Sequence, residues 1–251
     1  MAKMAAQNQL MTNWGGSLFI IGKIVRFLFF FLFLFSVLSQ SQTLAGFSRE
    51  EVIFFFLVFN LIDTLTQFLF RGVYVFRQRV VSGDFDLDLV KPLASFFRPI
   101  FGWTDILDFI TLIPLACFTV YFVFANQLFS SWFSLVLFGL FFLNAVLIAF
   151  AIHLFVSSIG VMTTEVDHLI WIWRDLFGLA RFPTDIYSPK TRFVLTFLLP
   201  IILVVTFPAK ALMGLLTWPW VIFSFTMGIG LVFLSLRFWR FALRRYHSAS
   251  S

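Results

Sequence analysis

Charged residues are scarce in this chain. Only 12% of its 251 residues are Asp, Glu, Lys or Arg, whereas soluble domains carry about 25%. Hydrophobic residues make up 61%, including 40 phenylalanines, and the mean hydropathy is +0.97. This balance excludes a soluble globular domain and predicts an all-α polytopic membrane protein. The apolar runs are continuous rather than alternating, which excludes a transmembrane barrel.

Cysteine and histidine are also rare. Cys117 is the only cysteine, so the chain forms no intramolecular disulfide and no cysteine-rich metal site. The three histidines are scattered, and no Ser/His/Asp arrangement accompanies them. Glu165 and His168 share a predicted helix face, but no further ligand supports a metal, and a local ion pair explains them better. We predict no metal site.

Nucleotide and calcium motifs are absent as well. Residues 15–23, GGSLFIIGK, resemble a P-loop, but one required glycine falls at Ser17 and the required Ser or Thr at Ile24. The acidic run DFDLD (84–88) resembles the start of a calcium loop, yet its sixth and twelfth positions are Leu89 and Ser95 instead of Gly and Glu. We therefore expect no cofactor in this chain and no ATP hydrolysis by it.

Basic residues outnumber acidic ones, which gives a formal net charge of +6 and a pI near 9.9. In a membrane protein this excess fixes orientation, because Lys and Arg gather on the cytoplasmic side. We therefore expect no nucleic acid partner. The basic residues gather in the N-terminal flank, in the loop 71–102 and at the C-terminus, which predicts that all three are cytoplasmic. The loop 126–131 has no Lys or Arg and is predicted to be outside.

Long apolar runs predict the membrane spans. Five runs approach or exceed the ~20 residues that cross a bilayer. They are residues 27–46, 52–70, 103–125, 132–157 and 218–238. Ahead of them, residues 5–25 have a polar and an apolar half and predict a helix on the membrane surface. No repeat or soluble domain is visible, so residues 1–251 form one transmembrane domain.

The predicted orientation requires a sixth crossing between residues 158 and 217. Two segments compete for it, about 160–181 and 193–213. The first is amphipathic and carries Glu165, Asp167, His168, Arg174 and Asp175. Basic residues ahead of the second favour it as the crossing, whereas Pro200 and Pro208 within it argue against it. Either choice gives six spans.

A polar stripe runs along the span 52–70. Asn60, Asp63, Thr64 and Gln67, followed by Arg71, have the spacing of one helical face. A central Asp costs about 2.5–3.5 kcal/mol, which the apolar residues offset only if the stripe faces protein or water. The stripe either holds helices together or lines a translocation path, and the residues alone leave both readings open.

Three segments resemble one branch of the type-2 ATP-binding-cassette (ABC-2) exporter permeases. The loop SGDFDLDLVKPLASFFRP (82–99) resembles the Ser-Gly-acidic turn and Lys/Arg-Pro-Leu element of that branch. The end ALRRYHSASS (242–251) resembles the family's C-terminus. Residues 182–214 resemble its proline-marked outer segment. The resemblance covers nearly the whole chain, and the three segments together are specific.

The resemblance implies a fold and partners. It implies six spans, an N-terminal interfacial helix and outer re-entrant helices before the last span, so that 160–181 crosses and 191–213 stays outside. It implies that the loop 71–102 docks on a separate ATPase subunit, present in two copies, which binds ATP and Mg. A second permease, identical or related, would complete the transporter in the inner (plasma) membrane among its lipids.

The docking contact is expected from residues 80–98. Ser82 and Gly83 would allow a tight reversal, because Gly tolerates positive φ. Asp84 or Asp86 would cap a short helix, and the residue before Pro92 would end it. The residues expected to make the contact are Ser82, Gly83, Asp84, Asp86, Leu87, Leu89, Val90, Lys91 and Pro92. Of these, Leu87, Leu89 and Val90 would form its apolar face. The basic flanks Arg77, Arg79 and Arg98 would meet acidic ATPase surface or lipid headgroups.

Two other functions fit parts of the sequence. An ion-coupled secondary transporter or channel would use Asp63 with Asp105 or Asp108, although the repeats typical of such proteins are missing. An intramembrane lipid-modifying enzyme would rest on the group Glu165, Asp167 and His168. The transported substrate stays open, because phenylalanine-rich spans suit an amphipathic substrate and simple lipid solvation equally.

Overall fold

The computed structural model describes residues 13–40, 43–163 and 167–246, and helices dominate this part of the chain. The long helices are α2 (Asn13–Gln40), α3 (Arg49–Phe70), α7 (Ile106–Ala125), α8 (Trp132–Thr163) and α13 (Trp218–Leu243). The shorter helices are α4 (Val73–Val81), α5 (Asp84–Leu89), α6 (Phe97–Phe101), α9 (Asp167–Phe177), α10 (Pro189–Phe193), α11 (Ile201–Val204) and α12 (Thr206–Leu212). Single turns η1 (Gly178–Arg181), η2 (Thr184–Ile186) and η3 (Val194–Leu198) and the strands β1 (Thr43–Leu44) and β2 (Phe47–Ser48) complete the list.

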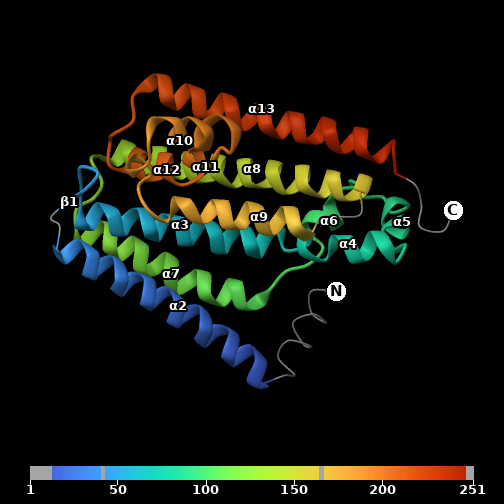
Figure 1. Ribbon diagram of the computed structural model, residues 1–251, viewed down its shortest axis with the longest axis horizontal. Helices are drawn as coiled ribbons and strands as arrows, with labels where there is room; N and C mark the ends of the chain where they lie inside the picture. Colours follow the sequence, from blue (N-terminus) through green and yellow to red (C-terminus); the bar gives the residue numbers. More distant parts are fainter. Residues whose placement is uncertain (1–12, 41–42, 164–166, 247–251) are drawn as a thin grey trace.

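The long helices run along the long axis of the molecule (Figure 1). α8 packs along α13 and also against α11 and α12, while α3 packs against α7. One end of the bundle carries β1 and α10 to α12. The opposite end carries α4, α5 and α6 and the end of α13, whereas the start of α2 lies below the middle of the molecule. Two of the segments predicted to be cytoplasmic, the loop 71–102 and the end of α13, thus adjoin the same end of the bundle.

Five helices in the described part of the chain are long and apolar enough to cross a membrane. They are Ile20–Ser39, Arg49–Val81, Ile106–Ala125, Trp132–Thr163 and Trp218–Leu243. The pair Pro189–Leu198 and Ile201–Leu212 is bent by 75° and brings the number to six if it is one broken span. The chain is therefore an all-α polytopic membrane protein.

The first helix differs from the prediction of a surface helix over 5–25 ahead of a span at 27–46. α2 is one uninterrupted helix from residue 13 to residue 40, so no break separates the two. At ~1.5 Å per residue it is ~42 Å long, more than the ~30 Å of a hydrocarbon core. Residues 5–12 lie outside the described part.

The segment 160–181 also differs from a full-length span. α8 continues to Thr163, and α9 has only 11 residues before the turn η1. At ~1.5 Å per residue α9 covers ~16 Å, about half of the hydrocarbon thickness. It contacts α4 and α8, and η1 contacts α3. The chain from α8 to α13 nevertheless passes from one end of the bundle to the other (Figure 1).

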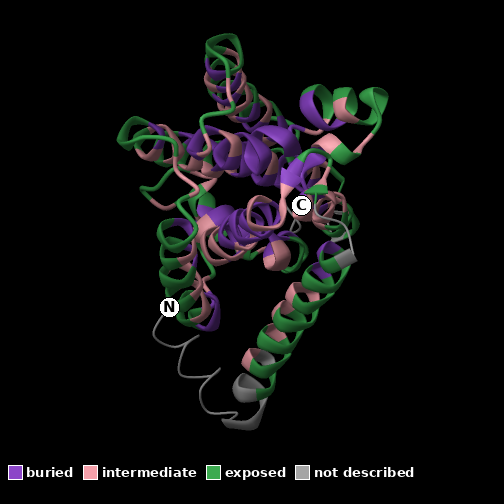
Figure 2. Cartoon of the chain, turned by 90° about the vertical axis from the view of Figure 1, so that its left-hand side faces the viewer, coloured by how far each residue is buried: buried purple, intermediate pink, exposed green. Residues whose placement is uncertain are grey.

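Local sequence explains how α3 comes to occupy the centre. A two-residue turn with positive φ at Ala45 and Gly46 closes the β1–β2 hairpin. Ser48 and Glu51 then form a capping box that starts α3. Two thirds of the α3–α4 span (67%) is buried, against 6% of the α2 span. Figure 2 accordingly shows α2 as a largely exposed helix that leaves the bundle.

The contact between α8 and α13 depends on one small residue. Asn144 in α8 donates hydrogen bonds from Nδ2 to the carbonyl oxygen and to Oγ of Ser224 in α13, each over 3.1 Å. A Cβ at Gly228 would overlap the side-chain oxygen of Asn144. No heavy atom lies near a Cβ built at Gly230, two residues further on.

We expect Gly228→Leu to lower the thermal unfolding temperature of the purified protein by several degrees. Overpacking a tight contact typically costs about 1–3 kcal/mol, and this substitution also displaces the Asn144 hydrogen bonds. Gly230→Leu is the matched control and should leave the unfolding temperature close to that of the unmodified protein. An equal fall in unfolding temperature for both substitutions would contradict the role of Gly228 in the contact between α8 and α13.

Candidate functional site

The first candidate site is the end of the bundle formed by α4, α5 and α6 (Figure 1). Gly83 reverses the chain with φ +77°, a conformation that glycine tolerates, so the predicted reversal is confirmed. Gly83 also occupies the N-cap position of α5, so the prediction that Asp84 or Asp86 caps this helix was wrong. Both aspartates lie in the first turn instead, where negative charge stabilises the helix dipole. α5 ends at Leu89, just ahead of Lys91-Pro92.

Asp88 is the electrostatic centre of this loop. Its side chain is 2% exposed and accepts hydrogen bonds from Arg79 (2.5 Å), Arg98 (2.8 Å) and Lys91 (3.0 Å). Burial raises the pKa of this carboxyl, but the hydrogen bonds from Lys91 and Arg79 and the neighbouring guanidinium charges lower it more, so the pKa lies below its ordinary value. The three cations come from α4, from the segment after α5 and from α6, so one carboxylate ties the loop together.

The basic flanks have a partner within the loop itself. Arg79 and Arg98 both pair with Asp88, and their contact with acidic ATPase surface or lipid headgroups stays a prediction. Asp88 itself was not among the expected site residues. Its position three residues after Phe85 places both on the inner face of α5, and both are buried.

Phe85 is the apolar anchor of the same face. Its ring contacts Phe76, Trp239 and Tyr246, with centroid distances of 5.1, 6.1 and 5.3 Å. Trp239 Nε1 in turn donates a hydrogen bond to Ser95 Oγ over 2.9 Å. These contacts join α5 to α4 and to the end of α13.

The outer face of the loop is apolar and exposed. Leu87, Leu89, Val90 and Leu93 have exposed fractions of 61%, 37%, 81% and 53%; we call these four residues the apolar edge. The three residues expected to form an apolar face belong to it. The loop therefore combines a rigid, ion-paired inner side with a hydrophobic outer side.

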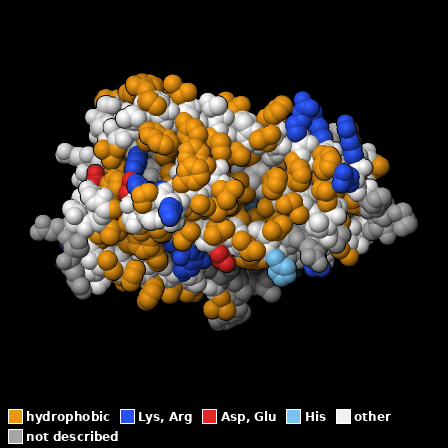
Figure 3. All heavy atoms as spheres, turned by 45° about the horizontal axis from the view of Figure 1, so that its top comes forward, with side chains coloured by type: hydrophobic (Ala, Val, Ile, Leu, Met, Phe, Trp, Pro, Cys, Tyr) orange, Lys and Arg blue, Asp and Glu red, His pale blue; other side chains and the backbone are white. Residues whose placement is uncertain are grey.

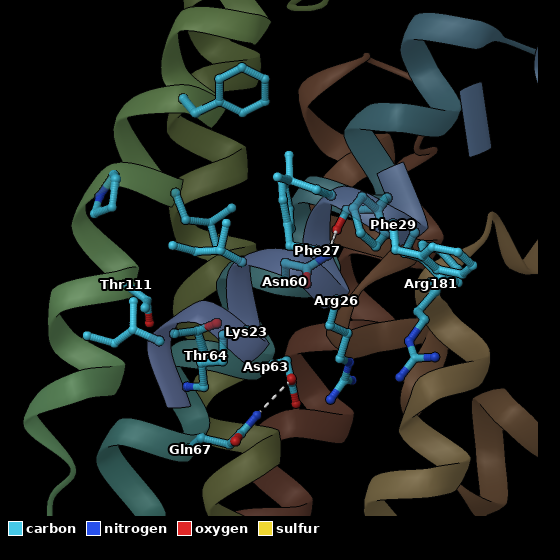
Figure 4. A pocket seen from close by; sticks show the side chains of 18 of the residues that line it. Lys23, Arg26, Phe27, Phe29, Asn60, Asp63, Thr64, Gln67, Thr111 and Arg181 are labelled. Carbon is cyan, nitrogen blue, oxygen red and sulfur yellow. Dashed lines mark hydrogen bonds between the residues drawn. The ribbon is translucent and has the colours of Figure 1, made fainter. Parts of the chain in front are cut away.

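The second candidate site is a cavity of about 480 Å³ between α2, α3 and α7, bounded also by α9 and η1. Asn60, Asp63, Thr64 and Gln67 all line it (Figure 4). Its apolar wall comes mainly from α2 and α7. The lining residues of that wall include Ile20, Ile24, Phe27, Leu28, Phe29, Phe30, Phe56, Ile110, Pro114, Leu115 and Phe118.

Basic side chains outnumber acidic ones around the cavity. Lys23 and Arg26 reach it from α2, Arg174 from α9 and Arg181 from η1. Among the described residues, Asp63 is the one acidic side chain that lines it. Figure 4 shows Arg26 and Arg181 extending to the side on which the Asp63 carboxylate lies. This concentration of cations was not predicted, because they come from two segments far from α3 in the sequence.

The polar stripe of α3 divides into two parts. Asn60, Asp63 and Thr64 face the cavity. Gln67 donates a hydrogen bond to Asp63 over 2.7 Å and accepts one from Arg174 over 3.0 Å, so it links α3 to α9. Arg71 forms ion pairs with Asp108 of α7 and with Asp105, which caps that helix. The stripe therefore joins helices at one end and lines a cavity at the other.

The carboxylates proposed for an ion-coupled transporter have structural roles. Asp105 caps α7 through the backbone N–H of Leu107 and pairs with Arg71 over 3.1 Å. Asp108 pairs with Arg71 over 3.3 Å and with Lys23. No group of three His, Cys, Asp or Glu side chains in the described ranges could hold a metal ion. Glu165, one of the residues considered for lipid chemistry, lies outside those ranges, and His168 is exposed.

The long apolar helices of the described part of the chain define a multi-pass membrane protein. The chain belongs to the ABC-2 transporter family, because the family described as ABC-2 family transporter protein matches residues 24–250. This match confirms the family resemblance seen in the sequence. Comparison with curated proteins and with solved structures found no match. The chain therefore has a permease-type role in an ABC transporter, as a transport component and not as a catalytic subunit.

Proposed function

We propose that this chain is the membrane-spanning subunit of an ABC exporter and that a separate ATPase subunit docks on α5. The observation that carries the proposal is the apolar edge, held outward by the ion network around Asp88. Exposed apolar side chains grouped beside charged ones are typical of an interaction surface. The partner would bind ATP and Mg, and its movement would reach the spans through Phe85 and Trp239.

The orientation follows from charge. Exposed Arg237, Arg240, Arg244 and Arg245 lie on α13 or directly after it. Figure 3 has hydrophobic side chains over the middle of the face that carries α13, and basic side chains near the end of that helix. Since basic residues favour the cytoplasmic side, this end, the loop with α5 and both termini are assigned to the cytoplasm, and the membrane is the inner (plasma) membrane.

The segment before α13 is proposed as an outer re-entrant pair. Pro200 separates two helical pieces at 75° to each other. Every residue of α11 and nearly all of α12 is buried, with α8 and α3 as neighbours. Irregular backbone at membrane depth is tolerated where protein covers it, so this packing suits a re-entrant segment and leaves the sixth crossing to α9 and η1.

Two permeases and two ATPase subunits would make the working transporter. The cavity is bounded by a single chain and remains open on one side. A second permease, identical or related, would complete the path between them, with membrane lipids around both. Permeases of this family generally work with an ABC ATPase and dimerise, which supports this assembly.

The proposal is tested by purifying the tagged chain from its native membrane in mild detergent. We expect a P-loop ATPase to co-purify with it in equimolar amount, and the complex to hydrolyse ATP when reconstituted in lipid nanodiscs. An ion-coupled transporter would purify without an ATPase and would transport in response to an imposed ion gradient. That second result would contradict the proposed function.

A further inference from the structure

We propose that the cavity between α2, α3 and α7 binds an amphiphile with an acidic headgroup, a phosphate or carboxylate joined to an apolar chain. This inference rests on the proposed transport function and names the class of substrate. It is carried by three independent features of the cavity, namely its excess of cations over carboxylates, its apolar wall and its exposed rim.

The cations of the cavity are only partly compensated. Lys23 is paired with Asp108, and Arg174 donates to Gln67. Arg181 lies over the rings of Phe30 and Phe59, at 5.4 and 5.5 Å from their centroids. Neither Arg26 nor Arg181 has an ion-pair or hydrogen-bond partner among the residues that the structure describes.

Two guanidinium groups that no described side chain pairs with directly favour an anion beside them. A charged side chain near the bilayer centre costs about 2.5–3.5 kcal/mol on insertion scales, and charges there normally face a partner or a polar cavity. Guanidinium groups bind phosphate and carboxylate through paired hydrogen bonds, and they are more weakly hydrated than ammonium groups. Arg26 and Arg181 are therefore suited to hold an acidic headgroup.

The rest of the cavity is suited to an apolar chain. Its volume of about 480 Å³ lies within the ~300–1,000 Å³ typical of small-molecule sites. The rim carries exposed apolar side chains from α2 and α7, among them Leu28 (49%), Phe29 (73%) and Ile110 (46%). Because α2 leaves the bundle (Figure 2), this rim faces the surface that a bilayer would cover. A chain can thus enter from the lipid while the headgroup meets the arginines.

Substituting Asp63 should have the opposite effect on ligand binding to substituting the arginines. Asp63 is the acidic side chain that lines the cavity in the described part of the chain, and it accepts a hydrogen bond from Gln67. An acidic ligand is repelled by this carboxylate and attracted by the two arginines. Asp63→Asn should therefore strengthen binding, whereas Arg26→Gln with Arg181→Gln should weaken it.

The test measures binding of dodecyl phosphate to the purified full-length chain by isothermal titration calorimetry in uncharged detergent. The double glutamine variant should lose at least tenfold in affinity, and Asp63→Asn should gain several-fold. Arg26→Lys with Arg181→Lys should recover part of the loss, because it restores the charge without the planar fork. Arg237→Gln on α13 is the control and should bind as the unmodified chain does.

Two further probes decide the class of ligand. Inorganic phosphate should compete only weakly, and dodecanol, which has the chain without the charge, should bind more weakly than dodecyl phosphate. Equal binding of inorganic phosphate would reduce the cavity to an anion site, and equal binding of dodecanol would remove the arginines from recognition; either result overturns the proposal. The titration contains no ATPase, so a failure to bind dodecyl phosphate would not count against ATPase docking on α5. Conversely, a variant that loses ATPase docking should still bind dodecyl phosphate.

Discussion

The double substitution Leu89→Asp and Val90→Asp is expected to abolish association with the ATPase subunit. The two side chains lie at the centre of the apolar edge, and their exposed fractions are 37% and 81%. Two carboxylates placed in a desolvated interface cost several kcal/mol, and every 1.4 kcal/mol is tenfold in affinity, so a loss of about 100-fold or more is expected. Pull-down of the ATPase with tagged permease variants, quantified against permease, measures the effect.

Two controls separate docking from folding. Leu89→Met with Val90→Ile keeps the edge apolar and should retain the ATPase. Because both residues point away from the buried side of α5, the aspartate variant should also keep the elution volume and unfolding temperature of the unmodified permease. Normal ATPase association by a correctly folded aspartate variant would contradict the proposed docking surface.

The second large effect is expected at Asp88. Asp88→Asn removes the charge that three cations share and leaves Arg79, Arg98 and Lys91 without their carboxylate. Breaking a buried ion pair on one side costs up to about 3–5 kcal/mol, and less here because the cations are partly exposed. We expect α5 to lose its fixed position, so that ATP hydrolysis no longer depends on substrate while the permease still inserts and purifies. Nanodisc assays of substrate-stimulated ATP hydrolysis measure this.

The pKa of Asp88 also sets the pH range in which the unmodified protein and Asp88→Asn can be compared. The folded pKa of this carboxyl lies below its ordinary value of 3.8. The stabilisation is therefore fully present above about pH 4 and is lost as the pH falls through the folded pKa. The comparison at pH 7 tests the charged network. Asp175→Asn, at an exposed position of α9 outside the loop, is the control, and an equal loss of coupling in both variants would contradict a special role for Asp88.

The spans were predictable because long apolar runs have few alternatives to a membrane helix. The ends of the spans were not predictable, because helix ends depend on single hydrogen bonds. The span predicted at 132–157 continues to Thr163. Ser158 and Thr163 donate their hydroxyls to the carbonyl oxygens of Leu154 and Ile159, so these polar side chains have partners within the helix. α8 therefore includes polar residues that hydropathy alone would place outside the span.

The segment 160–181 shows the limit of hydropathy and charge. Its polar residues left two segments in competition, and the predicted full-length helix is an 11-residue helix and a turn. Its place is set by contacts that sequence spacing does not reveal, such as the hydrogen bond from Arg174 to Gln67. Contacts with other helices, rather than the periodicity of the sequence, therefore determine the position of this segment.

The two candidate sites were predictable to different extents. Periodicity along α3 placed Asn60, Asp63 and Thr64 on one face, and the structure brings them into one cavity. Arg26 and Arg181 were missed because they approach from helices remote in sequence. In the loop, alternating aspartates gave no sign of which one turns inward, since that depends on cations of α4 and α6 folding over Asp88.

The central claim is that the ATPase sits on the apolar edge, and site-specific photocrosslinking tests it most directly. A photoreactive phenylalanine analogue at Val90 should crosslink to the ATPase in the native membrane. The same analogue at Leu215, equally apolar and 51% exposed near the opposite end of the bundle, should not. The predicted result is a crosslink to the ATPase from Val90 and none from Leu215. A fully active complex that shows no crosslink from Val90, Leu87 or Leu93 would contradict the account.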